Sequence, residues 1–143
     1  MGGRPVDLHL LDTHVWVWLV QGTPGGLKES AVESIRRAAA RSAVGISAIS
    51  VWEVAMLAAK GRIDLKMDCR DWVEMSIARA GIEVVPLLPE IAVESSRLPG
   101  DIHGDPSDRI IVATARHTNA VLVTRDRLLL AYGDRGHVRV LGA

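Results

Sequence analysis

Short runs of β-branched and aliphatic residues alternate along the chain with longer segments in which apolar positions recur every three or four residues. The short runs are typical of buried strands, and the longer segments of helices with one buried face. Strands that alternate with helices favour a parallel sheet covered on both faces, so we predict the α/β class. The predicted strands are Val6–Leu11, Val44–Ile46, Ile82–Val85, Val121–Thr124 and Val138–Leu141.

The segments between these strands begin and end with residues that are typical of helix ends. Ser47 stands where the N-cap of a helix running to Lys60 is expected, and Gly61 and Gly81 stand where helices end. The other predicted helices are Thr13–Val20, Ser30–Arg41, Cys69–Ala80, Pro89–Leu98, Ser107–His117 and Arg125–Ala131. A chain of 143 residues without repeats is expected to form a single domain over residues 1–143.

Composition and charge narrow the possible partners. Seventeen Lys and Arg balance seventeen Asp and Glu, so a nucleic acid would have to be held by local cations. No apolar run approaches the roughly 20 residues of a membrane span, so no membrane partner is expected. The single cysteine, Cys69, excludes an internal disulfide and a multi-cysteine metal site, and it favours a cytoplasmic location.

Acidic residues that follow strands are the candidates for chemistry, because ligands of parallel sheets bind beyond the carboxyl ends of the strands. Asp12 and Asp126 directly follow the first and fourth strands, while Asp105 and Asp108 lie where a loop becomes a helix. Each of the four could instead be an ordinary helix cap. Pro106 favours Asp105 as the cap of its helix, which leaves Asp108 as a candidate ligand.

Glu53 lies in a helix that is apolar almost all round, where a lone carboxylate would be costly to bury. A capping box from Ser50 to Glu53 would explain it, but the strand ending at Ile46 favours Ser47 as the cap. We therefore add Glu53 to the candidate ligands.

A shared site for these acids predicts a cation. Two unit charges 4 Å apart repel by about 4 kcal/mol at an effective dielectric near 20, and a divalent ion removes that cost. All-oxygen ligands select Mg²⁺ or Mn²⁺, and one or two such ions would suit hydrolysis of a phosphodiester.

Four strings together resemble, in order and spacing, the PIN-domain ribonucleases of VapC type, which are toxins of type II toxin–antitoxin pairs. The strings are Leu10-Leu11-Asp12-Thr13-His14-Val15, then Ser47 with Trp52-Glu53-Val54-Ala55, then Asp105 to Ala113, then Val123-Thr124-Arg125-Asp126. The resemblance runs from about Val6 to Leu141. It implies a three-layer Rossmann-like PIN fold with a mainly parallel sheet of order 3-2-1-4-5, and a Mg²⁺- or Mn²⁺-dependent endoribonuclease.

The resemblance also assigns roles to residues. Asp12, Glu53 and Asp108 match the family's catalytic, metal-binding acids, and Asp126 matches a fourth, more variable one. Polar groups or helix caps near the site would be Thr13, Ser47, Thr124 and Asp105. Where the family often has an aromatic residue between Pro106 and Asp108, this chain has Ser107, which puts any contact made by that aromatic residue in doubt.

The family further implies a homodimer and a small cognate, VapB-like antitoxin whose C-terminal segment occupies the acidic groove. Arg109 and Arg125 each adjoin a proposed ligand, so we expect them to contact RNA phosphates, with Arg116 and Arg127 as weaker candidates.

Other readings remain open. Asp12 could be the nucleophile of a phosphatase, although His14 stands where that family has a second Asp, or the chain could be a non-catalytic PIN interaction module. His103 and Asp105 could suggest a zinc pair, but no second histidine has the required spacing. Trp16, Trp18, Trp52 and Trp72 could stack on RNA bases, although core or dimer contacts are favoured.

Overall fold

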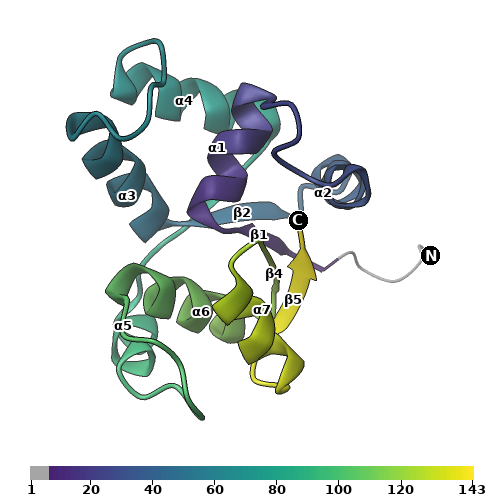
Figure 1. Ribbon diagram of the computed structural model, residues 1–143, viewed down its shortest axis with the longest axis vertical. Coiled ribbons are helices and arrows are strands. Elements are labelled where there is room, and N and C mark those ends of the chain that lie inside the picture. Colours follow the sequence, from purple (N-terminus) through teal and green to yellow (C-terminus); the bar gives the residue numbers. More distant parts are fainter. Residues whose placement is uncertain (1–6) are drawn as a thin grey trace.

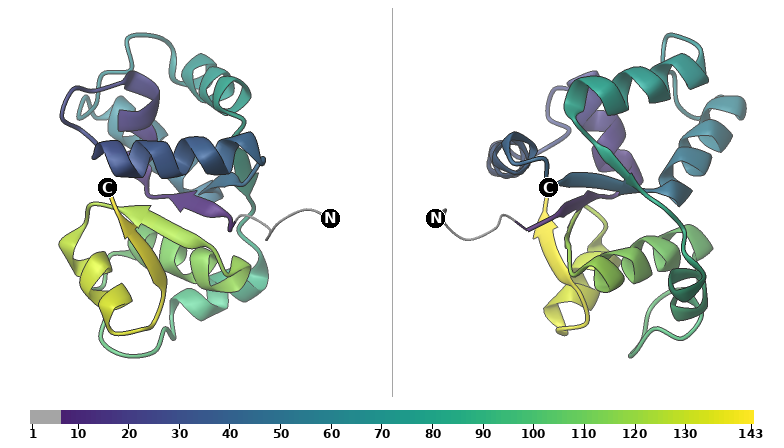
Figure 2. Two further views of the ribbon diagram at one scale, coloured as in Figure 1. Left: turned by 90° about the vertical axis from the view of Figure 1, so that its right-hand side faces the viewer. Right: turned by 180° about the vertical axis from the view of Figure 1, so that it is seen from behind.

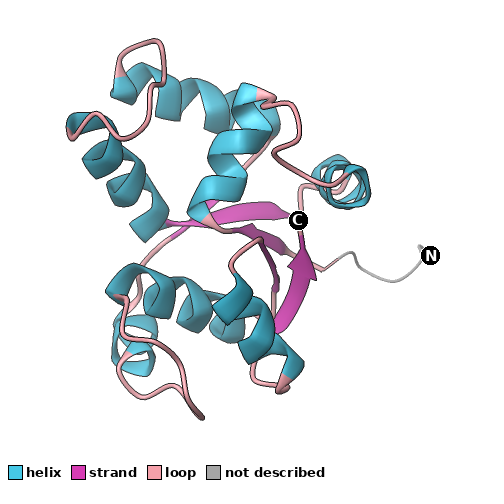
Figure 3. Ribbon diagram, in the orientation of Figure 1, coloured by secondary structure: helices cyan, strands magenta, loops and turns pink. Residues whose placement is uncertain are grey.

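The computed structural model describes residues 7–143, which form a five-stranded sheet between two layers of helices (Figures 1 and 3). The strands are β1 (His9–Leu11), β2 (Val44–Ser47), β3 (Glu83–Val85), β4 (Val121–Thr124) and β5 (Arg139–Gly142). The helices are α1 (Thr13–Gln21), α2 (Glu29–Ala40), α3 (Ala48–Ala59), α4 (Cys69–Ala80), α5 (Pro89–Ser95), α6 (Pro106–Thr118) and α7 (Arg127–Asp134).

The sheet has the order β3-β2-β1-β4-β5, which confirms the predicted α/β class and strand order. All four neighbouring pairs are parallel, so the sheet is entirely rather than mainly parallel. The chain crosses to the other side of β1 when it forms β4, and this change of direction is where open parallel sheets bind ligands.

Most predicted bounds differ from the observed ones by one or two residues, and three differences are larger. The first strand begins at His9, and Val6 lies outside the described residues. Helix α5 ends at Ser95 rather than Leu98. Helix α7 begins at Arg127 and runs to Asp134, because Asp126 is extended and caps the helix through the N–H groups of Leu128 and Leu129.

Alternate residues of the strands enter two separate hydrophobic clusters. Leu11 of β1 and Val123 of β4 pack with Trp16 of α1, against the layer that contains α1, α2 and α4. Leu10 and Leu122 face the opposite cluster, which contains residues of α5, α6 and α7. Figure 2 shows the sheet separating these two layers, and the two-residue period of a strand is what divides the core in this way.

Helix α3 departs from the expectation. Its apolar composition predicts burial, yet Ser50 and Val54 are its buried residues, and Trp52 is 55% exposed. The helix contacts α1, α4 and α6, so it bridges the two layers at one end of the sheet instead of covering a face (Figure 1). Trp16 and Trp72 do lie in the core, with ring centroids 5.0 Å apart. No helix of residues 7–143 has the length and apolarity needed to cross a membrane.

Candidate active site

A cleft of about 330 Å³ opens at the carboxyl ends of β1 and β4, next to the start of α6. It is lined by Asp12, His14, Val15, Trp18, Glu53, Asp105, Asp108, Arg125 and Asp126. The four acids proposed as ligands therefore share one cleft, although 114 positions of the sequence separate the first from the last.

Asp12 is fixed by two hydrogen bonds at the junction of β1 and α1. Its Oδ1 accepts the backbone N–H of Thr13 at 2.9 Å, so Asp12 is the N-cap of α1. Its Oδ2 accepts the hydroxyl of Thr124 at 2.8 Å. The same Thr124 oxygen accepts the N–H of Asp126 at 3.0 Å, so one threonine ties the ends of β1 and β4 together.

Glu53 reaches the cleft from the second turn of α3. Ser47 accepts the N–H of Ile49 at 3.2 Å and caps this helix, which confirms the cap inferred from the sequence and excludes the alternative capping box. Glu53 Oε1 instead accepts the hydroxyl of Thr13 at 2.5 Å, and Thr13 Oγ1 lies 2.9 Å from Ser50 Oγ. Buried hydroxyls thus orient this carboxylate toward Asp12.

Asp105 and Asp108 have different tasks at the start of α6. Asp105 Oδ1 accepts the N–H of Asp108 at 3.1 Å, which confirms Asp105 as the N-cap. The Asp108 carboxylate makes no such capping bond, and its side chain is only 17% exposed. Asp126 has two roles: its Oδ1 caps α7, and its carboxylate lines the cleft.

Sequence reasoning considered His103 only as a zinc partner of Asp105 and set it aside, but the structure places it beside the cleft. His103 Nε2 lies 3.3 Å from Asp108 Oδ2, and this nitrogen is buried without a hydrogen-bond partner in the described chain. Ligand atoms of His103, Asp108 and Asp126 all lie within 4.8 Å of one another. Only the path of the loop before α6 brings His103 here, and no spacing in the sequence shows it.

The proposed phosphate-binding arginines lie in unlike surroundings. The Arg109 guanidinium donates to the carbonyls of Ser95, Ile102 and His103, so it fastens the loop before α6 instead of pointing into the cleft. Arg109 does not line the cleft, and its contact with an RNA phosphate stays a prediction. Arg125 does line the cleft and donates from Nη1 to the carbonyl of Gly26. Arg127 is exposed on α7.

Burial, together with neighbouring negative charges, raises the pKa of three carboxyl groups. Burial, followed by the charges of Asp12, Asp105, Asp126 and Glu53, raises the pKa of Asp108 from 3.8 to about 7. Burial is also the main cause of the raised pKa values of Asp12 and Glu53, and the hydroxyls that bind these groups offset part of it. The cleft therefore holds its full negative charge at neutral pH only at a cost in free energy.

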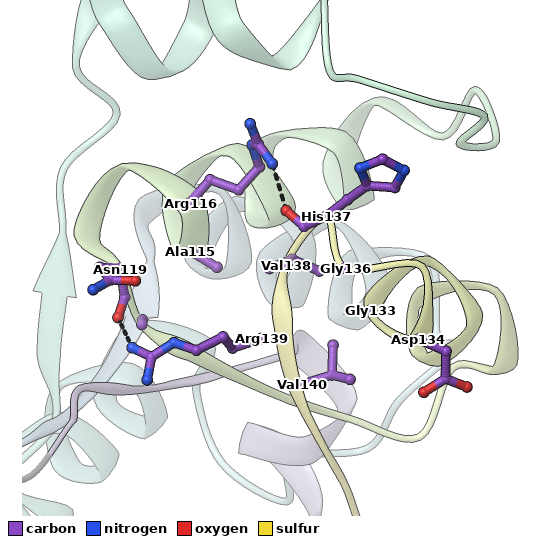
Figure 4. Close-up of a pocket in the computed structure, with 11 residues that line it drawn as sticks. Ala115, Arg116, Asn119, Gly133, Asp134, Gly136, His137, Val138, Arg139 and Val140 are labelled. Carbon is purple, nitrogen blue, oxygen red and sulfur yellow. Dashed lines mark hydrogen bonds between the residues drawn. The ribbon is translucent and has the colours of Figure 1, made fainter.

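A larger hollow of about 670 Å³ lies elsewhere, around the start of β5 and the ends of α6 and α7 (Figure 4). Figure 4 shows its two arginines engaged with backbone, Arg116 with the carbonyl of His137 and Arg139 with that of Asn119. Asp134 is the one carboxylate among its lining residues, and it points away from the arginines. This hollow has no cluster of acids, and we assign the chemistry to the smaller cleft.

The acidic cleft fits a divalent cation. Carboxylate oxygens are the donors that Mg²⁺ and Mn²⁺ prefer, and an imidazole nitrogen is acceptable to Mn²⁺. The raised pKa of Asp108, which burial and the neighbouring carboxylates cause, indicates that a positive group is needed among these side chains.

Comparisons with known proteins agree with this architecture. The sequence pattern of the PIN domain matches residues 9–134. Ribonuclease VapC22 of Mycobacterium tuberculosis is 34% identical over 123 residues, which are 86% of this chain and 90% of that protein.

Several solved structures share the fold of this chain. VapBC2 from Rickettsia felis, bound to a DNA fragment from its promoter, superimposes with a TM-score of 0.67 at 16% identity, covering 94% of this chain and 97% of the other. FitAcB from Neisseria gonorrhoeae gives a TM-score of 0.59 at 19% identity, covering 93% and 96%. At these identities the likeness shows the fold alone.

Proposed function

Because this chain belongs to the PIN-domain family, we propose that it is a metal-dependent endoribonuclease and the toxin of a type II toxin–antitoxin pair. The single observation that carries the proposal is the convergence of Asp12, Glu53, Asp108 and Asp126 on one cleft. The 34% identical relative, itself named a ribonuclease, supports RNA as the substrate. We further propose that residues 1–143 act as one domain, since all five strands belong to one sheet.

The four acids would hold Mg²⁺ or Mn²⁺, and His103 lies within reach of the same ion. When bound, the cation acidifies a water molecule and stabilises negative charge on the oxygens of the scissile phosphodiester. The chain's own polar groups prepare this site. Thr124 orients Asp12 and Thr13 orients Glu53, so both carboxylates are fixed before substrate arrives.

Arg125 is a positively charged residue in a cleft that is lined mainly by carboxylates. Its Nη1 is held by Gly26, and its remaining N–H groups make no hydrogen bond within residues 7–143. A guanidinium in the same cleft as the carboxylates is suited to a phosphate oxygen that neighbours the cleaved bond.

A phosphatase that uses Asp12 as its nucleophile is the weaker alternative. Both carboxylate oxygens of Asp12 accept hydrogen bonds, and His14 stands where such enzymes have a second Asp. A non-catalytic binding module would have no use for four acids whose burial and crowding raise the pKa of three carboxyl groups.

A small antitoxin is the proposed partner, together with a second copy of this chain. The structural neighbours from Rickettsia felis and Klebsiella pneumoniae are toxin–antitoxin complexes, the latter with a TM-score of 0.55 at 23% identity over 82% of this chain and 86% of that one. An arginine from such a partner would neutralise the carboxylates as a cation does, and so would block the cleft.

Cleavage of a structured RNA by the purified chain tests the enzyme. We expect cleavage with Mg²⁺ or Mn²⁺, none in EDTA, and a loss of at least about 100-fold in Asp12→Asn and Asp108→Asn, because each removes a ligand. Asp134→Asn, which lies outside the cleft, is the matched control and should cleave normally. Undiminished cleavage in EDTA would contradict the metal role, and hydrolysis of a phosphomonoester but not of RNA would favour the phosphatase.

Expression in bacteria tests the toxin role separately. Growth should stop when this chain is produced alone, and should recover when the neighbouring reading frame is produced with it. The Asp108→Asn variant should not arrest growth. Normal growth with the active chain would contradict the toxin role while leaving the nuclease proposal standing.

A further inference from the structure

The residues that line the cleft are of two chemical kinds. Five are carboxylates, which we call the acidic wall: Asp12, Glu53, Asp105, Asp108 and Asp126. The others, which we call the aromatic wall, are His14, Val15, Trp18 and Arg125. The carboxylates would hold a cation, but this role does not involve the residues of the aromatic wall.

Helix α1 joins the two walls. Asp12 caps this helix, and His14 and Trp18 lie four residues apart, so their side chains occupy the same face. Their ring centroids are 5.7 Å apart, with an angle of 52° between the ring planes. At 1.5 Å of rise per residue, His14 and Trp18 lie about 3 Å and about 9 Å beyond Asp12 along the helix axis.

Arg125 connects the aromatic wall to the acidic one from the other side. Its guanidinium carbon lies 5.1 Å from the centroid of the Trp18 ring, which is the distance of a cation–π contact. Arg125 directly precedes Asp126, and its bond to Gly26 fixes the guanidinium above the indole. A cation of the cleft lining thus lies against the Trp18 ring.

Both rings are at least partly exposed to solvent, so a ligand can contact them. His14 is exposed, and Trp18 is half-buried, in contrast to Trp16 and Trp72, which are 0% and 2% exposed and belong to the core. The Trp18 ring is held by its contacts with the Arg125 guanidinium and the His14 ring. A ring already fixed in its binding position loses little conformational entropy when a ligand stacks on it.

We propose that an unpaired nucleobase stacks on the exposed His14 ring, against which Trp18 packs, while Arg125, which lies over Trp18, contacts a phosphate of the same strand. The inference rests on the proposed function, because the acidic wall is where the strand would be cleaved. A π-face is accessible only on a base that has left its helical stack, so this surface selects a single-stranded segment or loop of RNA. Every base has such a face, so the stack by itself sets little sequence preference.

Binding of RNA in EDTA tests the inference without cleavage. The probe is a short fluorescein-labelled RNA strand of mixed sequence, free or annealed to its complement, and the dissociation constant is measured by anisotropy at one fixed salt concentration. We expect the free strand to bind more tightly than the duplex. His14→Ala, Trp18→Phe and Trp18→Ala should weaken binding of the free strand, with a loss of about 5- to 100-fold for Trp18→Ala.

Trp52→Ala is the matched control, because Trp52 is 55% exposed and does not line the cleft. It should leave the dissociation constant unchanged. His14→Ala changes an exposed side chain, so it is expected to fold even if Trp18→Ala does not.

A second measurement uses the unaltered protein and changes the RNA instead. Abasic nucleotides placed beside the mapped cleavage site should reduce cleavage, and abasic nucleotides several positions away should not.

The outcomes separate this inference from the proposed function. Equal binding of free and paired strands, or binding by His14→Ala and Trp18→Phe that matches the unaltered protein, overturns the inference even if RNA is cleaved. Binding that depends on both rings, without cleavage by any divalent metal, supports the inference and overturns the nuclease. If the RNA strands bind only through Arg125, with no effect of either ring, the surface belongs to a protein partner and the inference is wrong.

Discussion

At the scale of single residues, two threonines stabilise the negative charge of carboxylates in the cleft. Thr13 and Thr124 each direct a hydroxyl to a carboxylate, and each bond lowers a pKa that burial raises. Asp108 has no such donor, and burial together with the neighbouring carboxylates raises its pKa from 3.8 to about 7. His103 Nε2 lies 3.3 Å from this carboxylate.

Removal of the His103 imidazole should change the metal preference of the cleft. Nitrogen ligands favour Mn²⁺ over Mg²⁺, whereas carboxylates accept both. We expect His103→Ala to weaken Mn²⁺ binding by about 10-fold, the effect typical of losing an orienting group, and to change Mg²⁺ binding less. Calorimetric titration with each ion measures this. Equal losses for the two ions would show that His103 only shapes the loop, and His117→Ala is a control on the far part of α6.

At the scale of elements, the site is built from junctions where a strand or loop becomes a helix. Asp12, Asp105 and Asp126 cap α1, α6 and α7, so the residues that begin these helices also line the cleft. Helix formation thus fixes the backbone of three acids, and the amino ends of the helices favour their negative charge.

Two uncharged variants of Asp105 separate its capping role from its charge. Asparagine retains an oxygen for the N–H of Asp108, and alanine does not. We expect Asp105→Ala to be less stable than Asp105→Asn by about 1 kcal/mol, which is the typical value of a cap. Urea denaturation measures the difference, and Asp105→Asn should still cleave RNA. Equal stabilities would show that the cap contributes nothing to α6.

Helix α7 packs against β5 without room for one more carbon. A Cβ at Gly133 would lie 2.4 Å from Val140 Cγ2, and valine has little freedom to move aside. Alanine would gain about 1 kcal/mol in helix propensity, but overpacking costs about 1–3 kcal/mol. We expect Gly133→Ala to lower the free energy of unfolding, and Val140→Ala in the same chain to restore part of it. A melting temperature at or above that of the unaltered chain would contradict the close contact.

The sequence was sufficient to predict the sheet order through the family resemblance, and to predict through position that several acids would meet in one cleft. Asp12 and Asp126 were expected there because parallel strands end at one edge, and Glu53 because Ser47 fixed the register of α3. The contacts of His103 and Arg109 were not predicted, for one shared reason. Both depend on the path of residues 96–105, where no hydrophobic period determines the backbone, so neither contact could be inferred from spacing.

At the scale of the whole molecule, the cleft couples stability to pH and to cations. The pKa of Asp108 is about 7 in the folded chain, above the 3.8 expected when unfolded, and the pKa values of Asp12 and Glu53 are also raised. Between pH 4 and 7 the folded state therefore binds more protons than the unfolded state. Its stability is highest relative to the unfolded state at the acidic end and falls as the pH rises through this window.

We accordingly expect the melting temperature in EDTA to fall by several degrees between pH 5 and pH 8, because a loss on the order of 2 kcal/mol follows from the raised pKa values. Asp108→Asn should flatten this dependence, since its amide does not ionise, and should melt higher than the unaltered chain at pH 8. Mn²⁺ should reverse the loss at pH 8, because a ligand at 100 times its dissociation constant adds about 2.7 kcal/mol. Asp134→Asn, away from the cleft, should retain both the pH dependence and the response to Mn²⁺. A metal-free chain that grows more stable from pH 5 to pH 8, or a response to Mn²⁺ that Asp108→Asn leaves intact, would show that these carboxylates are neither crowded nor the ligands of the ion.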